Sequence, residues 1–261
     1  MSRSPLASLA LAGGLTVLGP PVAAVRPAAA DDIQRATLAQ RDARTPEVST
    51  EDLRRILAER SATVFDARPA MEFALGHIPG AVNLAAKPGQ PMSLYVSDVA
   101  EVGRVLGGDR AAPVVLYCNG PFCGKSSRLA EELVAAGYTG VRRYQLGAPV
   151  WRALGGVMHL EPEGFEHIRR DDRTAVVFDA RSAEEFAVGT LEGTVHLPRE
   201  EVARAKDDGR LPMEDHNTRI VVFGTGAAQA RAVAEEIARN AFHNVMFCAE
   251  PLCRRQATAT R

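Results

Sequence analysis

Cysteine is scarce in this chain, with four residues in 261, and neither charge is in excess, since 31 Lys and Arg residues stand against 32 Asp and Glu residues. This balance leaves no polybasic face or acidic tail, which argues against nucleic acid and anionic membrane surfaces as primary partners. What remains is ordinary for a globular protein: 46% apolar and 24% charged residues. The length allows one large domain or two small ones.

The first thirty residues have the order of a secretory signal. Arg3 is followed by an apolar run from Leu6 to Leu18 and then by Ala28–Ala30. The run is shorter than the roughly 20 residues that span a bilayer. We therefore expect a signal peptide at 1–30, export to the periplasm, no stable membrane insertion and a linker at 31–48. A retained membrane anchor is the competing interpretation.

The rest of the chain repeats itself. Val64–Arg68 returns as Val177–Arg181, 113 positions later, and Val114–Tyr117 returns as Ile220–Phe223. Two copies of one unit, each about 100 residues long, account for this pattern. We place the two domains at 49–155 and 164–255, with a linker at 156–163 and a C-terminal tail at 256–261.

Each copy alternates strand and helix patterns. Thr63–Phe65 and Val114–Tyr117 are short β-branched runs, typical of buried parallel strands. Thr50–Arg60 and Ser127–Ala136 each gather their apolar residues on one side, which predicts amphipathic helices. The expected fold class is therefore α/β, with a mostly parallel sheet flanked by helices in each domain.

Cys118 has the surroundings of a reactive thiol. It directly follows the predicted strand Val114–Tyr117 and precedes a loop and a predicted helix. The carboxyl ends of parallel strands are where α/β folds bind ligands. Loop N–H groups, the roughly half positive charge of a helix N-terminus and the charge of Lys125 would all favour the thiolate. The sequence thus predicts Cys118 as a nucleophile.

The chain resembles the rhodanese family. In the first copy the resemblance rests on motifs that occur in the family's order: Val64–Arg68, Glu72-Phe73, Gly76–Leu84, Leu116–Gly120, Gly137-Tyr138 with Val141, and Gly147 with Trp151. The second copy keeps Phe178–Arg181 and the turn at Gly193. The chain is thus similar to tandem rhodanese-domain sulfurtransferases, with the active type of loop in the first domain.

This resemblance implies sulfur transfer without a cofactor or metal. Cys118 would take sulfur from a small donor such as thiosulfate, carry it as a persulfide, and pass it to cyanide or a thiol. The substrate-binding residues implied are Asn119, Gly120, Pro121, Phe122, Gly124, Lys125 and Arg68. For Arg68 the alternative is a structural ion pair with a neighbouring acid. His77 is assigned to packing, and Ser126 and Ser127 to capping the helix.

The loop departs from the family pattern in two ways. Lys125 comes later after Cys118 than the corresponding residue of the usual rhodanese loop, and Cys123 stands between them. Cys123 has two further roles open to it besides a structural one. It is either a resolving thiol, which attacks a persulfide or sulfenic acid on Cys118, or half of a resting Cys118–Cys123 disulfide. Exported proteins meet an oxidising compartment, where such pairs form readily.

The second copy lacks this chemistry, because Gly224 stands where the first copy has Cys118. We expect it to be catalytically silent. Near the C-terminus, Cys248 and Cys253 repeat the spacing of the first pair, which suggests a disulfide there, with free thiols as the alternative. A zinc site built from all four cysteines is disfavoured, because it needs all four thiolates in one place and Cys-x4-Cys is not the tight Cys-x2-Cys spacing usual there.

Three functions remain open at this point. The first is a sulfurtransferase that uses Cys118. The second is a non-catalytic module that binds a partner or carries a persulfide, since a fold alone does not determine function. The third is a thiol-disulfide oxidoreductase that works through Cys118 and Cys123. A cysteine phosphatase or arsenate reductase is more distant, because those enzymes usually carry an arginine where this loop has Lys125.

Overall fold

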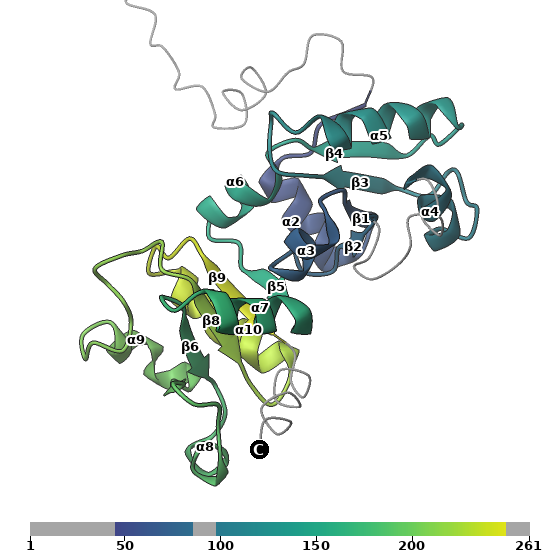
Figure 1. Cartoon of the computed structure of the whole chain (residues 1–261). Helices are drawn as coiled ribbons and strands as arrows, with labels where there is room; N and C mark the ends of the chain where they lie inside the picture. Colours follow the sequence, from purple (N-terminus) through teal and green to yellow (C-terminus); the bar gives the residue numbers. More distant parts are fainter. Residues whose placement is uncertain (1–44, 86–97, 249–261) are drawn as a thin grey trace, which may run out of the picture. The chain divides into compact units, whose positions relative to one another are not determined.

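The computed structural model describes residues 45–85 and 98–248, and the predicted signal peptide, most of the expected N-terminal linker and the C-terminal tail lie outside these ranges. The described chain forms two parallel sheets flanked by helices, as expected (Figure 1). Within the described residues, no helix has the length and apolar character needed to cross a membrane.

The first sheet has the strand order β2-β1-β3-β4, with all pairs parallel. Its elements follow one another as α2 Thr50–Glu59, β1 Thr63–Asp66, α3 Ala70–Ala74, β2 Val82–Asn83, α4 Asp98–Val105, β3 Val114–Tyr117, α5 Gly124–Ala135, β4 Val141–Tyr144 and α6 Gly147–Ala153. The predicted strands and the helix after Ser49 are confirmed. Ser49 accepts a hydrogen bond from the Asp52 amide, the N-cap interaction that begins α2.

Neighbouring residues of the central strand β3 serve the two faces of the first sheet. Leu116 packs with the buried side chains of α4 and α5, including Val102 and Leu129. Val115 and Tyr117 pack on the opposite face with α2, for example with Leu53. All four residues of β3 are buried. This is why the strand has a continuous apolar run rather than an alternating pattern.

The second sheet has the order β5-β9-β8-β6-β7, again all parallel. Its elements are β5 Met158–Leu160, α7 Pro162–Asp171, β6 Val176–Asp179, α8 Ala183–Val188, β7 Val195–His196, the 3-10 turn η2 Arg199–Glu201, α9 Val202–Ala205, β8 Ile220–Phe223, α10 Ala227–Ala238 and β9 Val245–Cys248. The register repeats between copies, since Phe65 pairs with Leu116 and Phe178 pairs with Val222.

The stretch 156–163 differs from the linker expected there. It contains strand β5, which pairs with β9, and the first residues of α7. Met158 and Leu160 are buried while His159 between them is only partly so, the alternation of a strand. The second copy therefore begins with its own strand directly after the glycines that follow α6.

Candidate functional site

Cys118 lies at the carboxyl end of β3, one of the two central strands of the first sheet. Only 2% of its surface is exposed. Its carbonyl oxygen accepts a hydrogen bond of 3.0 Å from the amide of Ala148 in α6. The backbone of Cys118 is thus held between the end of a buried strand and the start of a helix, as a positioned reactive group requires.

A buried polar network fixes the residue before it. The hydroxyl of Tyr117 donates to Oδ2 of Asp66 over 2.6 Å and accepts from the amide of Ile78 over 3.0 Å. Burial, with Asp66 adding to it, raises the pKa of Tyr117 well above its ordinary value. The hydroxyl therefore keeps its proton and stays a donor to the buried carboxylate.

Arg68 belongs to this network rather than to the loop of Cys118. Its guanidinium pairs with Oδ2 of Asp66 at 2.6 Å and donates to the carbonyl of Gly76 at 2.8 Å, and the residue is 6% exposed. Arg181 does the same in the second copy, with Asp179 at 2.5 Å and the Gly189 carbonyl at 2.8 Å. These contacts favour the structural ion pair over the substrate contact for Arg68.

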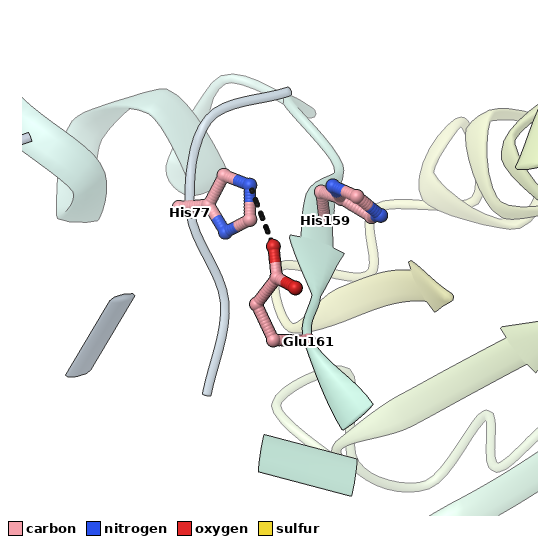
Figure 2. A group of neighbouring side chains, drawn as sticks. All are labelled: His77, His159 and Glu161. Carbon is pink, nitrogen blue, oxygen red and sulfur yellow. Dashed lines mark ion pairs between the residues drawn. The ribbon is translucent and has the colours of Figure 1, made fainter. Parts of the chain in front are cut away.

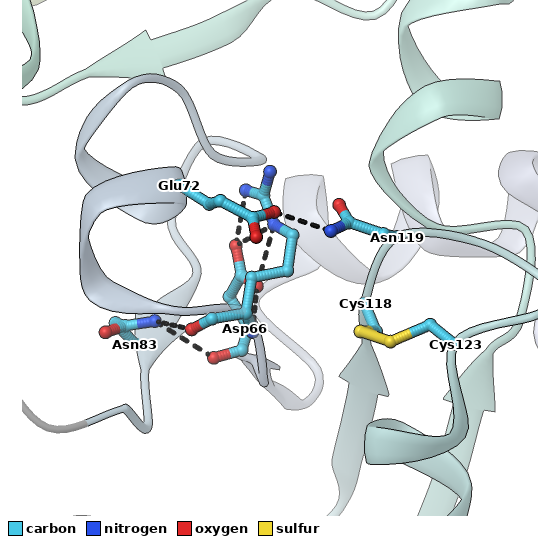
Figure 3. The surroundings of a disulfide bond; sticks show 7 residues. Asp66, Glu72, Asn83, Cys118, Asn119 and Cys123 are labelled. Carbon is cyan, nitrogen blue, oxygen red and sulfur yellow. Dashed lines mark hydrogen bonds and ion pairs between the residues drawn. A yellow bond between two sulfur atoms is a disulfide. The ribbon is translucent and has the colours of Figure 1, made fainter.

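Cys118 and Cys123 are joined by a disulfide, with their Cα atoms 6.2 Å apart (Figure 3). The loop between them turns at Gly120, whose φ of +100° lies in the region that favours glycine. The amide of Cys123 closes the turn with a 3.0 Å hydrogen bond to the Gly120 carbonyl. The structure therefore shows the oxidised form of the predicted pair.

Cys123 is also the N-cap residue of α5. The helix begins at Gly124, three residues earlier than expected, and no side chain caps its first N–H groups. Ser126 and Ser127 lie within its first turn, so the expectation that they cap the helix is wrong. The helix N-terminus, with its partial positive charge, thus adjoins the sulfur of Cys123 as well as the loop of Cys118.

Most of the remaining predicted residues are exposed, in the loop or in the first turn of α5. Pro121, Phe122, Gly124 and Lys125 are exposed, and Gly120 is buried. The side-chain amide of Asn119 donates to Oε2 of Glu72 over 2.5 Å (Figure 3). Burial raises the pKa of the Asp98 carboxyl, against the lowering effect of the charges of Arg128 and Lys125. Along the sequence Glu72 is only part of a motif, and its contact with the loop arises from the tertiary fold.

The corresponding loop of the second copy is shorter and already filled. Three residues separate β8 from α10, against six between β3 and α5. Oε1 of Gln229 accepts from both the amide and the hydroxyl of Thr225, at 2.7 and 2.9 Å. A Cβ placed on Gly224 would lie 2.6 Å from this same oxygen. This loop has no thiol, and a side chain at the Cys118 position would have to displace the amide of Gln229.

Away from the loop of Cys118, the side chains of His77, His159 and Glu161 form a cluster of potential metal ligands (Figure 2). Their ligand atoms lie within 4.8 Å of one another. Tetrahedral zinc, with bonds of 2.0 to 2.1 Å, needs ligand atoms about 3.4 Å apart, which is closer than the 4.8 Å over which these atoms spread. The ring of His77 stacks on Phe73 with 3.7 Å between centroids, and its Nδ1 lies 3.1 Å from the Phe73 carbonyl.

His77 is neutral at physiological pH. Burial, helped by the neighbouring His159, lowers its pKa to about 3. The 3.7 Å contact between its Nε2 and Oε1 of Glu161 therefore joins a neutral ring to a carboxylate and is not an ion pair. These contacts support the packing role expected for His77.

Cys248, the last described residue, is disulfide-bonded and fully buried. Cys253, its predicted partner, lies outside the described residues.

The model of the rhodanese-like domain matches this chain twice, at residues 49–154 and 163–250. The chain belongs to the rhodanese-like family. Both matches agree with the repeat seen in the sequence and with the two parallel sheets. Among curated proteins, no sequence matches this chain.

Solved structures that resemble this rhodanese-like protein do so at low identity. A structure of EanB with hercynine is 16% identical, with 82% of this chain and 61% of that chain covered and a TM-score of 0.39. Thiosulfate sulfurtransferase from Pseudomonas aeruginosa is 21% identical, with 78% and 40% covered and a TM-score of 0.33. A rhodanese-like domain from Anabaena sp. is 21% identical, with 44% and 79% covered and a TM-score of 0.36. At these values the likenesses carry no argument about activity.

Proposed function

We propose that this protein is a sulfurtransferase of the thiosulfate type, exported to the periplasm, in which Cys118 carries sulfur as a persulfide. The observation that carries the proposal is the placement of Cys118 at the carboxyl end of β3, in a glycine turn that runs into the uncapped N-terminus of α5. N–H groups at such a site stabilise a negatively charged sulfur.

The first half-reaction is a displacement at sulfur. The thiolate of Cys118 attacks the outer sulfur of thiosulfate, a new S–S bond forms, and sulfite leaves with the electron pair of the old bond. Lys125, exposed in the first turn of α5, supplies positive charge for the dianionic donor. Cyanide or a thiol then takes the outer sulfur from the persulfide.

The proposed reaction requires that the Cys118–Cys123 disulfide be reduced first. With Cys118 bonded to Cys123 there is no thiolate to react, so the protein must first be reduced. We expect no thiocyanate from thiosulfate and cyanide before treatment with a dithiol, and turnover after it.

The test is an assay on protein that has been reduced and desalted. With thiosulfate alone, the wild-type protein should either gain about 32 Da, the mass of one sulfur atom, or release one equivalent of the outer sulfur of thiosulfate as sulfide. The Cys118→Ser variant should show neither result. Thiocyanate formation should be lost in the same variant. Sulfur loading that persists in Cys118→Ser would assign the reaction to another residue and defeat the proposal.

The disulfide also favours a second candidate, a thiol-disulfide oxidoreductase. In that case the reduced pair would reduce substrate disulfides, and thiosulfate would neither leave sulfur on the protein nor release sulfite or sulfide. The sulfur-loading experiment separates the two functions.

A further inference from the structure

The Cys118–Cys123 pair points to a reaction beyond simple sulfur transfer. We propose that Cys123 attacks the persulfide on Cys118, releases hydrosulfide, and leaves the disulfide seen in the structure. This inference rests on the proposed function, since it needs a persulfide on Cys118. The overall activity would then be the reduction of thiosulfate to sulfite and sulfide at the expense of a dithiol.

The geometry supplies the first argument. The two sulfur atoms are bonded, so after reduction they stay within reach of each other without refolding of the loop. Both backbones are anchored independently of the disulfide. The carbonyl of Cys118 is held by the Ala148 amide, and the amide of Cys123 is held by the Gly120 carbonyl. Helix α5, which follows directly after Cys123, is fixed by its buried residues Leu129 and Leu133.

Exposure supplies the second argument. Cys118 is 2% exposed, whereas Cys123 is partly exposed at the end of the loop. An external thiol must reach the inner sulfur of a Cys118 persulfide through the loop, while the thiol of Cys123 is already beside it. A neighbouring thiol in the same chain has an effective concentration in the millimolar range or above. Attack from within the loop is therefore favoured over attack by dilute external thiols.

The electrostatics supply the third argument. Cys123 is the N-cap of a twelve-residue helix whose first N–H groups have no side-chain cap. The partial positive charge there favours the thiolate of Cys123, which is the attacking form. Hydrosulfide is a weaker base than an alkyl thiolate, so it is the better leaving group from the persulfide.

The step balances. The sulfur of Cys123 forms a bond with the inner sulfur, Sγ of Cys118, and the bond between Sγ and the outer sulfur breaks. The outer sulfur leaves with that electron pair, the proton of the Cys123 thiol ends on it, and hydrosulfide is released. The outer sulfur is reduced and the two cysteines are oxidised to the disulfide. A dithiol reductant then attacks the more exposed sulfur, that of Cys123, and returns both thiols.

The experiment is a single turnover with the full chain and no reductant. Reduced, desalted protein is mixed anaerobically with one equivalent of thiosulfate, and sulfide, sulfite and protein mass are followed. Wild-type protein should release sulfide in step with sulfite, and peptide mapping should then show the Cys118–Cys123 disulfide. Cys123→Ser should release sulfite, retain about 32 Da and release sulfide about 100-fold more slowly.

Two further variants serve as controls. Cys123→Ala should behave as Cys123→Ser, which excludes an effect of the new hydroxyl. Glu131→Gln, an exposed position on the same helix, should release sulfide as the wild type does. Circular dichroism of each variant checks the fold.

The outcomes separate this inference from the proposed function. A wild-type persulfide as stable as that of Cys123→Ser, with no sulfide released, would overturn the inference and leave the sulfurtransferase intact. The absence of any sulfur on all variants, with no sulfite, would defeat the proposed function itself.

Discussion

Gly147 lies directly against the backbone of Cys118. A Cβ at position 147 would come 2.3 Å from the Cys118 carbonyl oxygen and 2.4 Å from the amide nitrogen of Gly120. Gly147 also has a φ of +65°, where glycine is favoured. The start of α6 can therefore lie against the loop of Cys118 only because this residue has no side chain.

We expect Gly147→Ala to move the loop of Cys118. Thiocyanate formation should then fall by more than the loss of folding stability accounts for. Overpacking of this kind costs about 1 to 3 kcal/mol. Gly155→Ala is the matched control, because its φ is +78° but nothing lies within 4 Å of a Cβ there. It should cost about 1 kcal/mol from backbone strain. Urea unfolding measures the stability of each variant, and the cyanide assay measures its thiocyanate formation. Equal activities in the two folded variants would contradict the prediction.

Arg68 and Arg181 should behave alike, because each neutralises a buried aspartate in its own copy. Replacing either with alanine leaves an unpaired buried carboxylate, which costs about 3 to 5 kcal/mol. The KM for thiosulfate should change little in any Arg68→Lys protein that folds, since Arg68 faces Asp66 and Gly76 rather than the loop. Lys125→Ala should instead raise that KM with little loss of stability. A large KM effect confined to Arg68→Lys would restore Arg68 to the substrate site.

Because His77 is buried, we expect the free energy of unfolding to fall in mild acid. Its pKa is about 3 in the folded protein and about 6.5 when unfolded. Between these values the unfolded chain binds a proton that the folded chain does not, so stability falls as the pH falls. The slope is up to about 1.4 kcal/mol per pH unit. His77→Gln should flatten the slope between pH 6 and pH 5, and the exposed His243→Gln should not. Unfolding curves across this window would show an unchanged slope in His77→Gln if the assignment were wrong.

A cysteine placed at the corresponding position of the second copy should stay inactive. Gly224→Cys puts a Cβ at the site 2.6 Å from Oε1 of Gln229, in a loop only three residues long. We expect no sulfur loading at Cys118→Ser/Gly224→Cys, measured by intact mass after thiosulfate. Adding Gln229→Ala relieves the contact but still leaves the short loop. Sulfur on the double variant would show that the thiol, and not the loop, is what the second copy lacks.

The sequence predicted the strands and the repeat well because both rest on local patterns. Val114–Tyr117 is a β-branched run, and the second copy returns it as Ile220–Phe223. The start of α5 was placed three residues late, because cysteine is not a typical N-cap residue and so Cys123 gave no signal. Strand β5 was missed because three residues are too few to show a period.

The candidate site was predicted less completely, for a physical reason. That Cys118 follows a strand can be read along the chain, but whether its sulfur meets that of Cys123 depends on Cα separation and on the direction of both side chains. The turn at Gly120 brings the two sulfur atoms together, and the φ angle of that residue cannot be read from the sequence. The partner of Arg68 lies only two residues away in Asp66, yet choosing it over the loop required the buried geometry.

The two copies share the aspartate–arginine pair, the strand register and a twelve-residue helix after the reactive strand, and they differ in the loop between. The second copy can therefore serve as an internal comparison for the chemistry of the loop. After reduction, an alkylating reagent that modifies Cys118 finds no thiol at the matching position, Gly224, which lies between a similar strand and a similar helix.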